Sequence, residues 1–256
     1  MKINSLFGLA ATLVCALAGA AESVDESSTP EAALENIIVT ARRIEENAQN
    51  IPVAISTFNA AELRQRGVSD IADLSGKTPS LTVDYSAPIS GASNAAAIYL
   101  RGIGQSDFLL TNDPAVGVYL DDIYIARSVG AILSLTEVER VEVLRGPQGV
   151  FFGRNTIGGA INVTTKKPSG SFGGRISLKV GEDGREDFGL GVDVPIIHDQ
   201  LTARASFNVE NRDGYITRVF AGDRLGNRNR DGAFINLEWT ASDQLQLRWL
   251  FDYVSI

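Results

Sequence analysis

The sequence has almost no cysteine or histidine, the residues that build disulfides and the thiolate and imidazole metal sites. Its 256 residues include one cysteine, Cys15, and one histidine, His198. Cys15 lies in an N-terminal segment that we expect to be cleaved off, so disulfides and thiolate metal sites are excluded from the mature chain. A single imidazole with no neighbouring ligand residues is more typical of a surface than of a metal centre. With no paired carboxylates or nucleophile constellation either, we expect no enzyme, no metal site and no cofactor.

Long hydrophobic runs and an excess of positive charge are also absent. The apolar stretch at residues 6–17 follows Lys2, precedes small residues and is too short to span a bilayer, which predicts a signal peptide over residues 1–21. Val14 before Cys15 disfavours a lipoprotein signal. The net charge of −8, without a basic patch among aromatic residues, argues against nucleic acid as a partner. Without another long apolar run, the chain would have to enter a membrane as a closed barrel.

The most informative segment runs from Glu139 to Pro168, where two strand-like runs flank glycine-rich turns. Gly146-Pro147 ends the first run, and alternation resumes at residues 160–164 after a glycine pair. A phosphate-binding loop does not fit, because Gly149 and Gly153 have the wrong spacing and no lysine follows. Around this segment we expect a globular α+β domain over residues 51–168, with a capped helix starting near Asn59.

Beyond Phe172 the helix signals stop and long alternating segments begin. Five such strands are expected, near residues 176–180, 188–194, 201–209, 233–239 and 245–253. Alternation alone is also compatible with a soluble sandwich. Strands of about nine residues match the height of an outer-membrane barrel, and the connections alternate between a tight turn at Ser242-Asp243 and a long polar loop from Asp213 to Asp231. These two features favour a barrel wall, with Trp239, Trp249 and Tyr253 as interfacial aromatics.

The run ERVEVLRGPQGVFFGRNTIGGAINVTTKKP, at residues 139–168, resembles the plug domain of TonB-dependent outer-membrane receptors. The resemblance implies a plug inside a barrel of about 22 strands. The composition of residues 22–35, rich in serine and acidic residues, predicts a tether, which we place over residues 22–50. The β-prone run near residues 35–43 is either the first strand of the following domain or, as the resemblance implies, a TonB box that binds TonB by strand addition. Asp122 stands where the family usually has glycine, so we expect strain at that turn. The residues that the resemblance implicates are Ile37, Ile38, Val39, Thr40 and Ala41 for TonB binding, Arg101 and Arg145 for a plug–barrel lock, and Ser106, Asp107, Phe108 and Asn112 for a ligand-facing plug loop.

Taken together, the chain is expected to be an α+β plug followed by the first five strands, residues 172–256, of an incomplete outer-membrane β-barrel. Five strands cannot close a barrel, so we expect these residues to be the N-terminal part of a longer receptor. The resemblance implies TonB-energised uptake of a scarce large ligand, with an iron–siderophore complex as the default and cobalamin or a glycan as options. It also implies TonB and outer-membrane lipid as partners. The alternative is a soluble periplasmic adaptor that binds TonB without transport.

Overall fold

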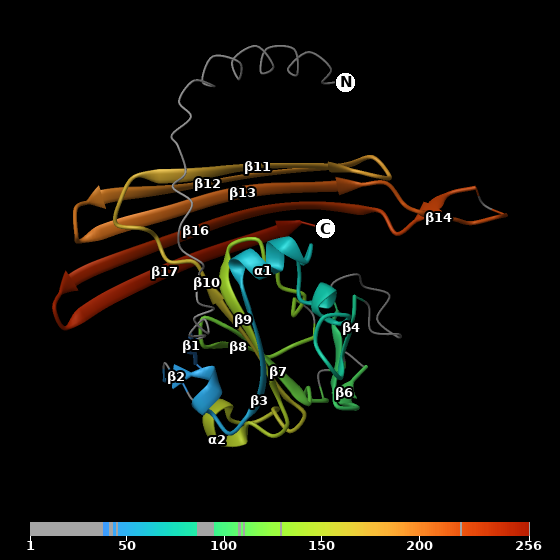
Figure 1. Cartoon of the computed structure of the whole chain (residues 1–256), viewed down its shortest axis with the longest axis horizontal. Coiled ribbons are helices and arrows are strands. Elements are labelled where there is room, and N and C mark those ends of the chain that lie inside the picture. Colours follow the sequence, from blue (N-terminus) through green and yellow to red (C-terminus); the bar gives the residue numbers. More distant parts are fainter. Residues whose placement is uncertain are drawn as a thin grey trace, which may run out of the picture. The chain divides into compact units, whose positions relative to one another are not determined.

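The computed structural model describes residues 38–40, 43–44, 46–85, 95–106, 109, 111–128, 130–220 and 222–255. The expected signal peptide and residues 22–37 of the expected tether lie outside this set. Two structured regions follow along the chain, which we call the globular part (residues 38–165) and the long-strand sheet (residues 173–255) (Figure 1). The globular part contains β1 (Ile38–Val39), β2 (Glu46–Asn47), β3 (Ala54–Asn59), α1 (Ala60–Gln65), β4 (Leu81–Asp84), β5 (Ala97–Leu100), β6 (Ile103–Gln105), β7 (Val116–Leu120), β8 (Ile123–Ile125), β9 (Val138–Arg145), α2 (Gly149–Phe152) and β10 (Gly159–Thr165), with 3-10 turns at Ala48–Asn50 and Ala72–Leu74.

A mixed five-stranded sheet forms the centre of the globular part, in the order β3-β9-β10-β7-β8. β9 and β10 are the two strand-like runs on either side of the glycine turns, and they pair antiparallel, whereas β10 and β7 pair parallel. Val141, Val143, Ile161 and Val163 on these strands are fully buried. Gly146-Pro147 ends β9 as expected, since proline cannot donate to the ladder. The expected α+β globular fold is confirmed.

Helix α1 begins where the sequence predicts a capping box. The Asn59 side chain accepts hydrogen bonds from the backbone N–H groups of Ala61 and Glu62, and the Glu62 carboxylate accepts one from the Asn59 N–H. These contacts satisfy N–H groups that have no partner inside the helix. Gly67 lies just beyond the helix with φ +67°, a conformation that favours glycine.

The turn between β7 and β8 contains the expected strain. Asp121 and Asp122 both have positive φ, +46° and +67°, as a tight two-residue hairpin requires. The two side chains have different environments. The Asp121 carboxylate accepts hydrogen bonds from the Thr165 N–H at 2.9 Å and from its hydroxyl at 2.6 Å. The Asp122 carboxylate is exposed and contacts only the Arg43 guanidinium, at 3.3 Å, among the described residues.

Glycine is therefore expected to have opposite effects at these neighbouring positions. Asp122→Gly should raise the free energy of unfolding by about 0.5–1 kcal/mol, because it relieves the left-handed strain and loses only an exposed ion pair. Asp121→Gly should lower it by about 1–3 kcal/mol, because two hydrogen bonds to Thr165 are lost. Denaturant midpoints of the two variants provide the measurement. Equal shifts of the same sign would contradict this account of the turn.

The long-strand sheet has the order β11-β12-β13-β16-β17, and every neighbouring pair is antiparallel (Figure 1). Its strands are β11 (Gly173–Gly181), β12 (Arg185–Ile197), β13 (Leu201–Arg212), β16 (Arg228–Ser242) and β17 (Leu245–Ser255). All five expected strands and the tight turn after Ser242 are present. The expected loop from Asp213 to Asp231 is too long, because the ladder between β13 and β16 continues to Arg212 and Arg228, and a small hairpin, β14 (Ile216–Thr217) with β15 (Arg224–Leu225), lies within the connection.

One face of the long-strand sheet is apolar and exposed, and the other is polar and, along β13 and β16, buried. Large side chains on the first face are 37% to 86% exposed, and they include Ile176, Leu178, Val180, Phe207, Ile235, Leu247, Trp249 and Phe251. The second face carries Arg204, Ser206, Asn208, Glu210, Arg230 and Asn236, which are at most 9% exposed. A soluble sandwich would show the reverse arrangement, whereas a wall with lipid outside and polar contents inside has this one. Among the described residues, no helix is long and apolar enough to cross a membrane.

Candidate functional site

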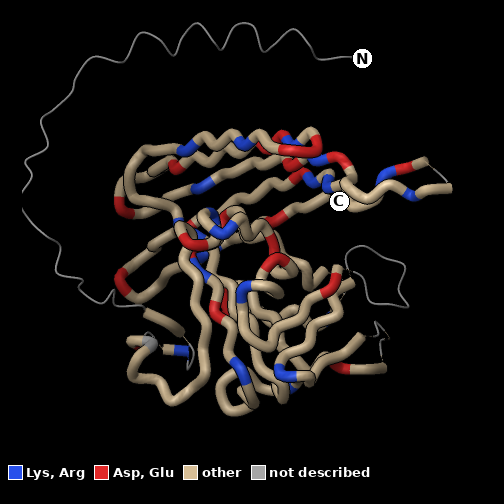
Figure 2. Tube along the Cα trace, turned by 45° about the vertical axis from the view of Figure 1, so that its right-hand side comes forward, with Lys and Arg blue, Asp and Glu red and all other residues tan. Residues whose placement is uncertain are grey.

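Ion pairs connect the globular part to the polar face of the long-strand sheet. Arg204 on β13 donates to the Glu137 carboxylate at 2.7 Å and to Asp193 on β12 at 2.5 Å. Glu137 immediately precedes β9, so this arginine joins the central sheet of the globular part to two long strands. Figure 2 shows that charged residues of both signs occur on the long strands as well as in the globular part.

A second connection centres on Asp70, which is fully buried. Its carboxylate accepts hydrogen bonds from Arg228 at 2.5 Å, from Arg230 at 3.0 Å and from the Tyr85 hydroxyl at 3.1 Å. The pKa of Tyr85 is raised, first because the phenol is buried and second because the Asp70 charge opposes its ionisation. Tyr85 therefore stays a neutral donor, and one buried carboxylate holds two arginines of β16.

The third connection involves Arg248 on β17, which lies 3.4 Å from Asp121 and donates to the Thr165 hydroxyl at 2.6 Å. Asn236 on β16 adds a hydrogen bond to the Lys166 carbonyl at 2.9 Å. The charges are distributed in the same way in all three ionic connections: the globular part supplies the carboxylates and the long strands supply the arginines. The alternation of β13 already placed Arg204 on the polar face, but the pairing depends on tertiary contacts that no sequence pattern displays.

Arg101 and Arg145, the two arginines expected to lock the plug to the barrel, take no part in these three connections. Arg101 follows β5, is exposed and has φ +54°. Arg145 ends β9, and its guanidinium donates to the Ile55 carbonyl at 3.4 Å, while its Nε is buried without a partner among the described residues. Within the described part of the chain neither arginine forms an ion pair, so their role as a lock remains a proposal.

Of the segment expected to bind TonB, Ile38, Val39 and Thr40 are described, whereas Ile37 and Ala41 lie outside the described residues. Ile38 and Val39 form β1, which pairs antiparallel with β2. Ile38 is 51% exposed, but Val39 is fully buried in a small cluster with Tyr119, Leu144 and other apolar residues. Within the expected tether, residues 38–39 and 46–47 form strands and residues 48–50 a 3-10 turn.

Glu142 holds the end of this short strand. Its fully buried carboxylate accepts hydrogen bonds from the Thr40 N–H at 2.8 Å and from the Arg140 Nε at 2.9 Å. The Asn162 amide donates to the Thr40 hydroxyl at 3.2 Å. A carboxylate in the central sheet therefore fixes the N-terminal strand by charge-assisted hydrogen bonds.

Residues of the loop expected to face the ligand are only partly described. Ser106 is half-buried and Asn112 is exposed, while Asp107 and Phe108 lie outside the described residues. A cavity of about 630 Å3 lies nearer the β13–β16 connection. Its lining includes Asp73, Tyr85, Arg212, Tyr215, Arg228 and Arg230. Arginines lie over both tyrosine rings, with Arg212 at 5.3 Å from the Tyr215 centroid and Arg228 at 6.0 Å from that of Tyr85.

A globular α+β part joined by ion pairs to a sheet with an exposed apolar face defines a membrane protein with a plug and a wall. Residues 47–160 match the family model "TonB-dependent Receptor Plug Domain". The pesticin receptor of Yersinia pestis is 34% identical over 172 residues, which cover 66% of this chain and 23% of that receptor. The vitamin B12 transporter BtuB of Vibrio vulnificus is 26% identical over 157 residues, covering 60% of this chain and 24% of that protein.

Solved structures show the same architecture. The ferric yersiniabactin uptake receptor FyuA from Yersinia pestis superposes with a TM-score of 0.65 at 27% identity, covering 79% of this chain and 30% of that one. The pyoverdine outer-membrane receptor FpvA from Pseudomonas aeruginosa has a TM-score of 0.68 at 21% identity, covering 85% of this chain and 30% of that one, which supports the fold alone.

The chain therefore belongs to the TonB-dependent outer-membrane receptors, with the globular part as plug and the long-strand sheet as part of the wall. This membership agrees with the expected location in the bacterial outer membrane, and the proteins that the chain resembles are receptors and transporters rather than enzymes. The chain spans about a quarter of the length of the curated relatives it matches.

Proposed function

We propose that this chain is the plug and the first wall strands of a receptor that takes up a ferric siderophore through energy supplied by TonB. The observation that carries the proposal is the ionic seating of the plug on the polar face of the wall, through Asp70, Asp121 and Glu137. A plug seated in this way closes the wall until a signal loosens it. The similarity to a ferric yersiniabactin uptake receptor supports an iron-complex cargo, and the similarity to the vitamin B12 transporter BtuB leaves vitamin B12 as an alternative cargo.

The cargo is proposed to bind in the arginine- and tyrosine-lined cavity together with the plug loop of Ser106, Asp107, Phe108 and Asn112. The cavity volume of about 630 Å3 is in the range of drug-sized ligand sites. Buried Nε atoms of Arg212 and Arg230 have no partner among the described residues, so an anionic group would supply acceptors that they lack. The siderophore brings its own ligands to iron, and the protein needs only to recognise the outer surface of the complex.

TonB is proposed to bind residues 37–41 by strand addition. β1 is only two residues long and pairs only with β2 among the described residues, so a partner's strand would replace one short ladder, although it would also have to release Val39 and Thr40 from the plug. Arg101 and Arg145 are proposed to lock the plug against carboxylates on wall strands other than the five described. The unpartnered Arg145 Nε is consistent with a missing acceptor.

Uptake of radioactive iron tests the function in a strain that lacks its own siderophore receptors. Cells making the complete receptor that contains this chain would be given a panel of ferric siderophores and labelled vitamin B12. We expect receptor-dependent uptake of at least one ferric siderophore, lost when TonB is deleted. Uptake of vitamin B12 alone would mean that vitamin B12, and not a ferric siderophore, is the cargo. Uptake that is independent of TonB would refute the proposed energy source.

A further inference from the structure

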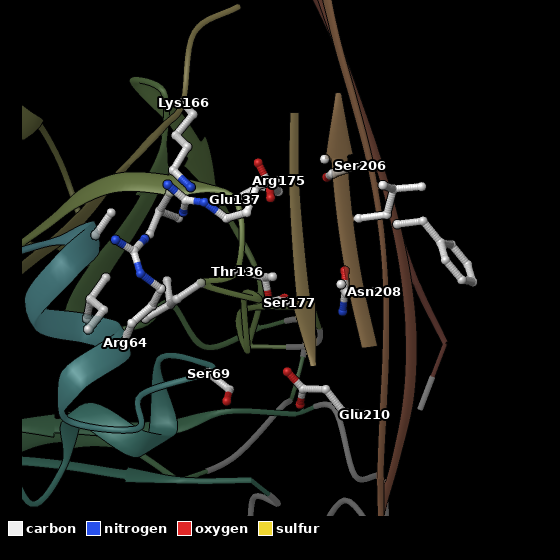
Figure 3. Close-up of a pocket in the computed structure, with 18 of the residues that line it drawn as sticks. Arg64, Ser69, Thr136, Glu137, Lys166, Arg175, Ser177, Ser206, Asn208 and Glu210 are labelled. Atoms are coloured by element: carbon white, nitrogen blue, oxygen red, sulfur yellow. The ribbon is translucent and has the colours of Figure 1, made fainter. Parts of the chain in front are cut away.

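A recess separates the α1 side of the globular part from the polar face of β11, β12 and β13 (Figure 3). It has a volume of about 100 Å3. Two glycines help to create it, because Ser206 lies opposite Gly191 and Asn208 opposite Gly189 in the β12–β13 ladder. Because glycine has no side chain, the space beside Ser206 and Asn208 stays open.

Four cations line the recess, namely Arg64, Lys166, Arg175 and Lys179. Figure 3 shows Arg64, Lys166 and Arg175 converging around Glu137, while Ser206, Asn208 and Glu210 lie in a row along β13. The two carboxylates of the lining already have partners, since Glu137 is bound by Arg204 at 2.7 Å and Glu210 lies 3.9 Å from Arg228. Within the described part of the chain, none of the four cations forms an ion pair.

The cations also destabilise one another. The pKa of Arg64 is lowered, mainly by burial and then by the charge of Arg175, with Glu137 acting in the opposite direction. The pKa of Lys166 is lowered by burial, and Arg204, Arg175 and Arg64 lower it further against the effect of Glu137. A negative charge among them would relieve this repulsion.

Neutral donors without partners face the same space. Ser206 and Asn208 are each 9% exposed and line the recess. The Ser206 hydroxyl and the Asn208 amide nitrogen have no hydrogen-bond partner among the described residues. Buried polar atoms normally have one, and leaving them without one is costly. Unused donors and unpaired cations therefore line one small volume.

We propose that this recess binds a small oxyanion, a phosphate or a carboxylate, between its four cations and the donors of β13. The volume exceeds what a single water needs and admits one such group. Its occupant would neutralise cations on both sides of the junction and so strengthen the seating of the plug. The proposal does not depend on the identity of the transported cargo.

The test is isothermal titration calorimetry, in which inorganic phosphate is added at constant ionic strength to the protein purified in detergent. We expect saturable binding that weakens at least tenfold in Lys166→Gln. Lys167→Gln is the matched control, because it removes the same charge one residue away, outside the lining of the recess, and should leave binding unchanged. Acetate in competition distinguishes a carboxylate site from a phosphate site. Absence of saturable binding of both anions, or equal loss in the two variants, would overturn the proposal.

A second measurement covers the case in which Lys166→Gln does not fold. A thiol introduced as Asn208→Cys would be treated with anionic and cationic methanethiosulfonate reagents of similar size. We expect the anionic reagent to react about tenfold faster, because the recess attracts negative charge. Thr78→Cys is the control, since Thr78 is also buried, at 4% exposed against 9% for Asn208, and its hydroxyl has no partner among the described residues, but it does not line this recess. Equal rates for the two reagents at position 208 would contradict an anion site.

Discussion

Replacing Asp70 with asparagine is expected to lower the free energy of unfolding of the globular part by about 3–5 kcal/mol. Asparagine keeps the size of the side chain but removes the charge that Arg228 and Arg230 share, and Arg230 is only 4% exposed. Arg230 would then lack its counter-ion among the described residues, while Arg228 would keep only its longer ionic contacts with Asp73 at 3.6 Å and Glu210 at 3.9 Å. Hydrogen exchange of the β9 and β10 amides measures the effect, and their protection should fall about a hundredfold or more.

Asp223→Asn is the control for this experiment, because Asp223 pairs with Arg218 on an exposed connection. Exposed ion pairs contribute little, so protection in the globular part should stay unchanged. If Asp70→Asn retained normal protection, the Asp70 connection would not seat the plug, and the observation on which the proposed function rests would fail.

Replacing Val39 with proline is expected to reduce energised uptake to background while cargo binding stays within about twofold of wild type. Proline removes the N–H that a partner strand would use and fixes φ, so strand addition is blocked. Val39 also packs in the plug, so the variant would release β1 from its cluster. Transport assays with the receptor in cells, and binding assays in de-energised cells, separate the two effects.

Ile44→Pro provides a control close in sequence, since Ile44 is 57% exposed and lies outside β1 and β2. It should transport normally. Wild-type uptake by Val39→Pro would remove residues 37–41 from the mechanism, and loss of cargo binding in that variant would mean that its effect is on folding instead.

Local patterns predicted the parts of the fold that local interactions determine. Asn59 and Glu62 form the capping box of α1 from residues three positions apart, and Asp121-Asp122 form the strained hairpin. Strict alternation predicted all five long strands and put Arg204 on the polar face. Each of these features depends on neighbours within a few residues, which the sequence displays directly.

Features that depend on tertiary contacts were not predicted. Arg204 and Glu137 are 67 residues apart, and Arg228 and Asp70 are 158 apart, so neither pair leaves a pattern in the sequence. For residues 37–41 the sequence left a first strand and a TonB box open. It could not show the burial of Val39, because that burial depends on distant contacts with Glu142 and with the apolar cluster around Tyr119.

The central claim is that residues 37–41 couple this plug to TonB, and photo-cross-linking from position 38 tests it most directly. Ile38 is exposed on β1, so a photoreactive phenylalanine analogue there should be accepted without disturbing the core. The account predicts a covalent adduct with TonB in energised cells, strengthened by cargo, and none from the same analogue at position 197, on the exposed end of β12. Absence of a TonB adduct from position 38 in cells that take up the cargo would contradict it.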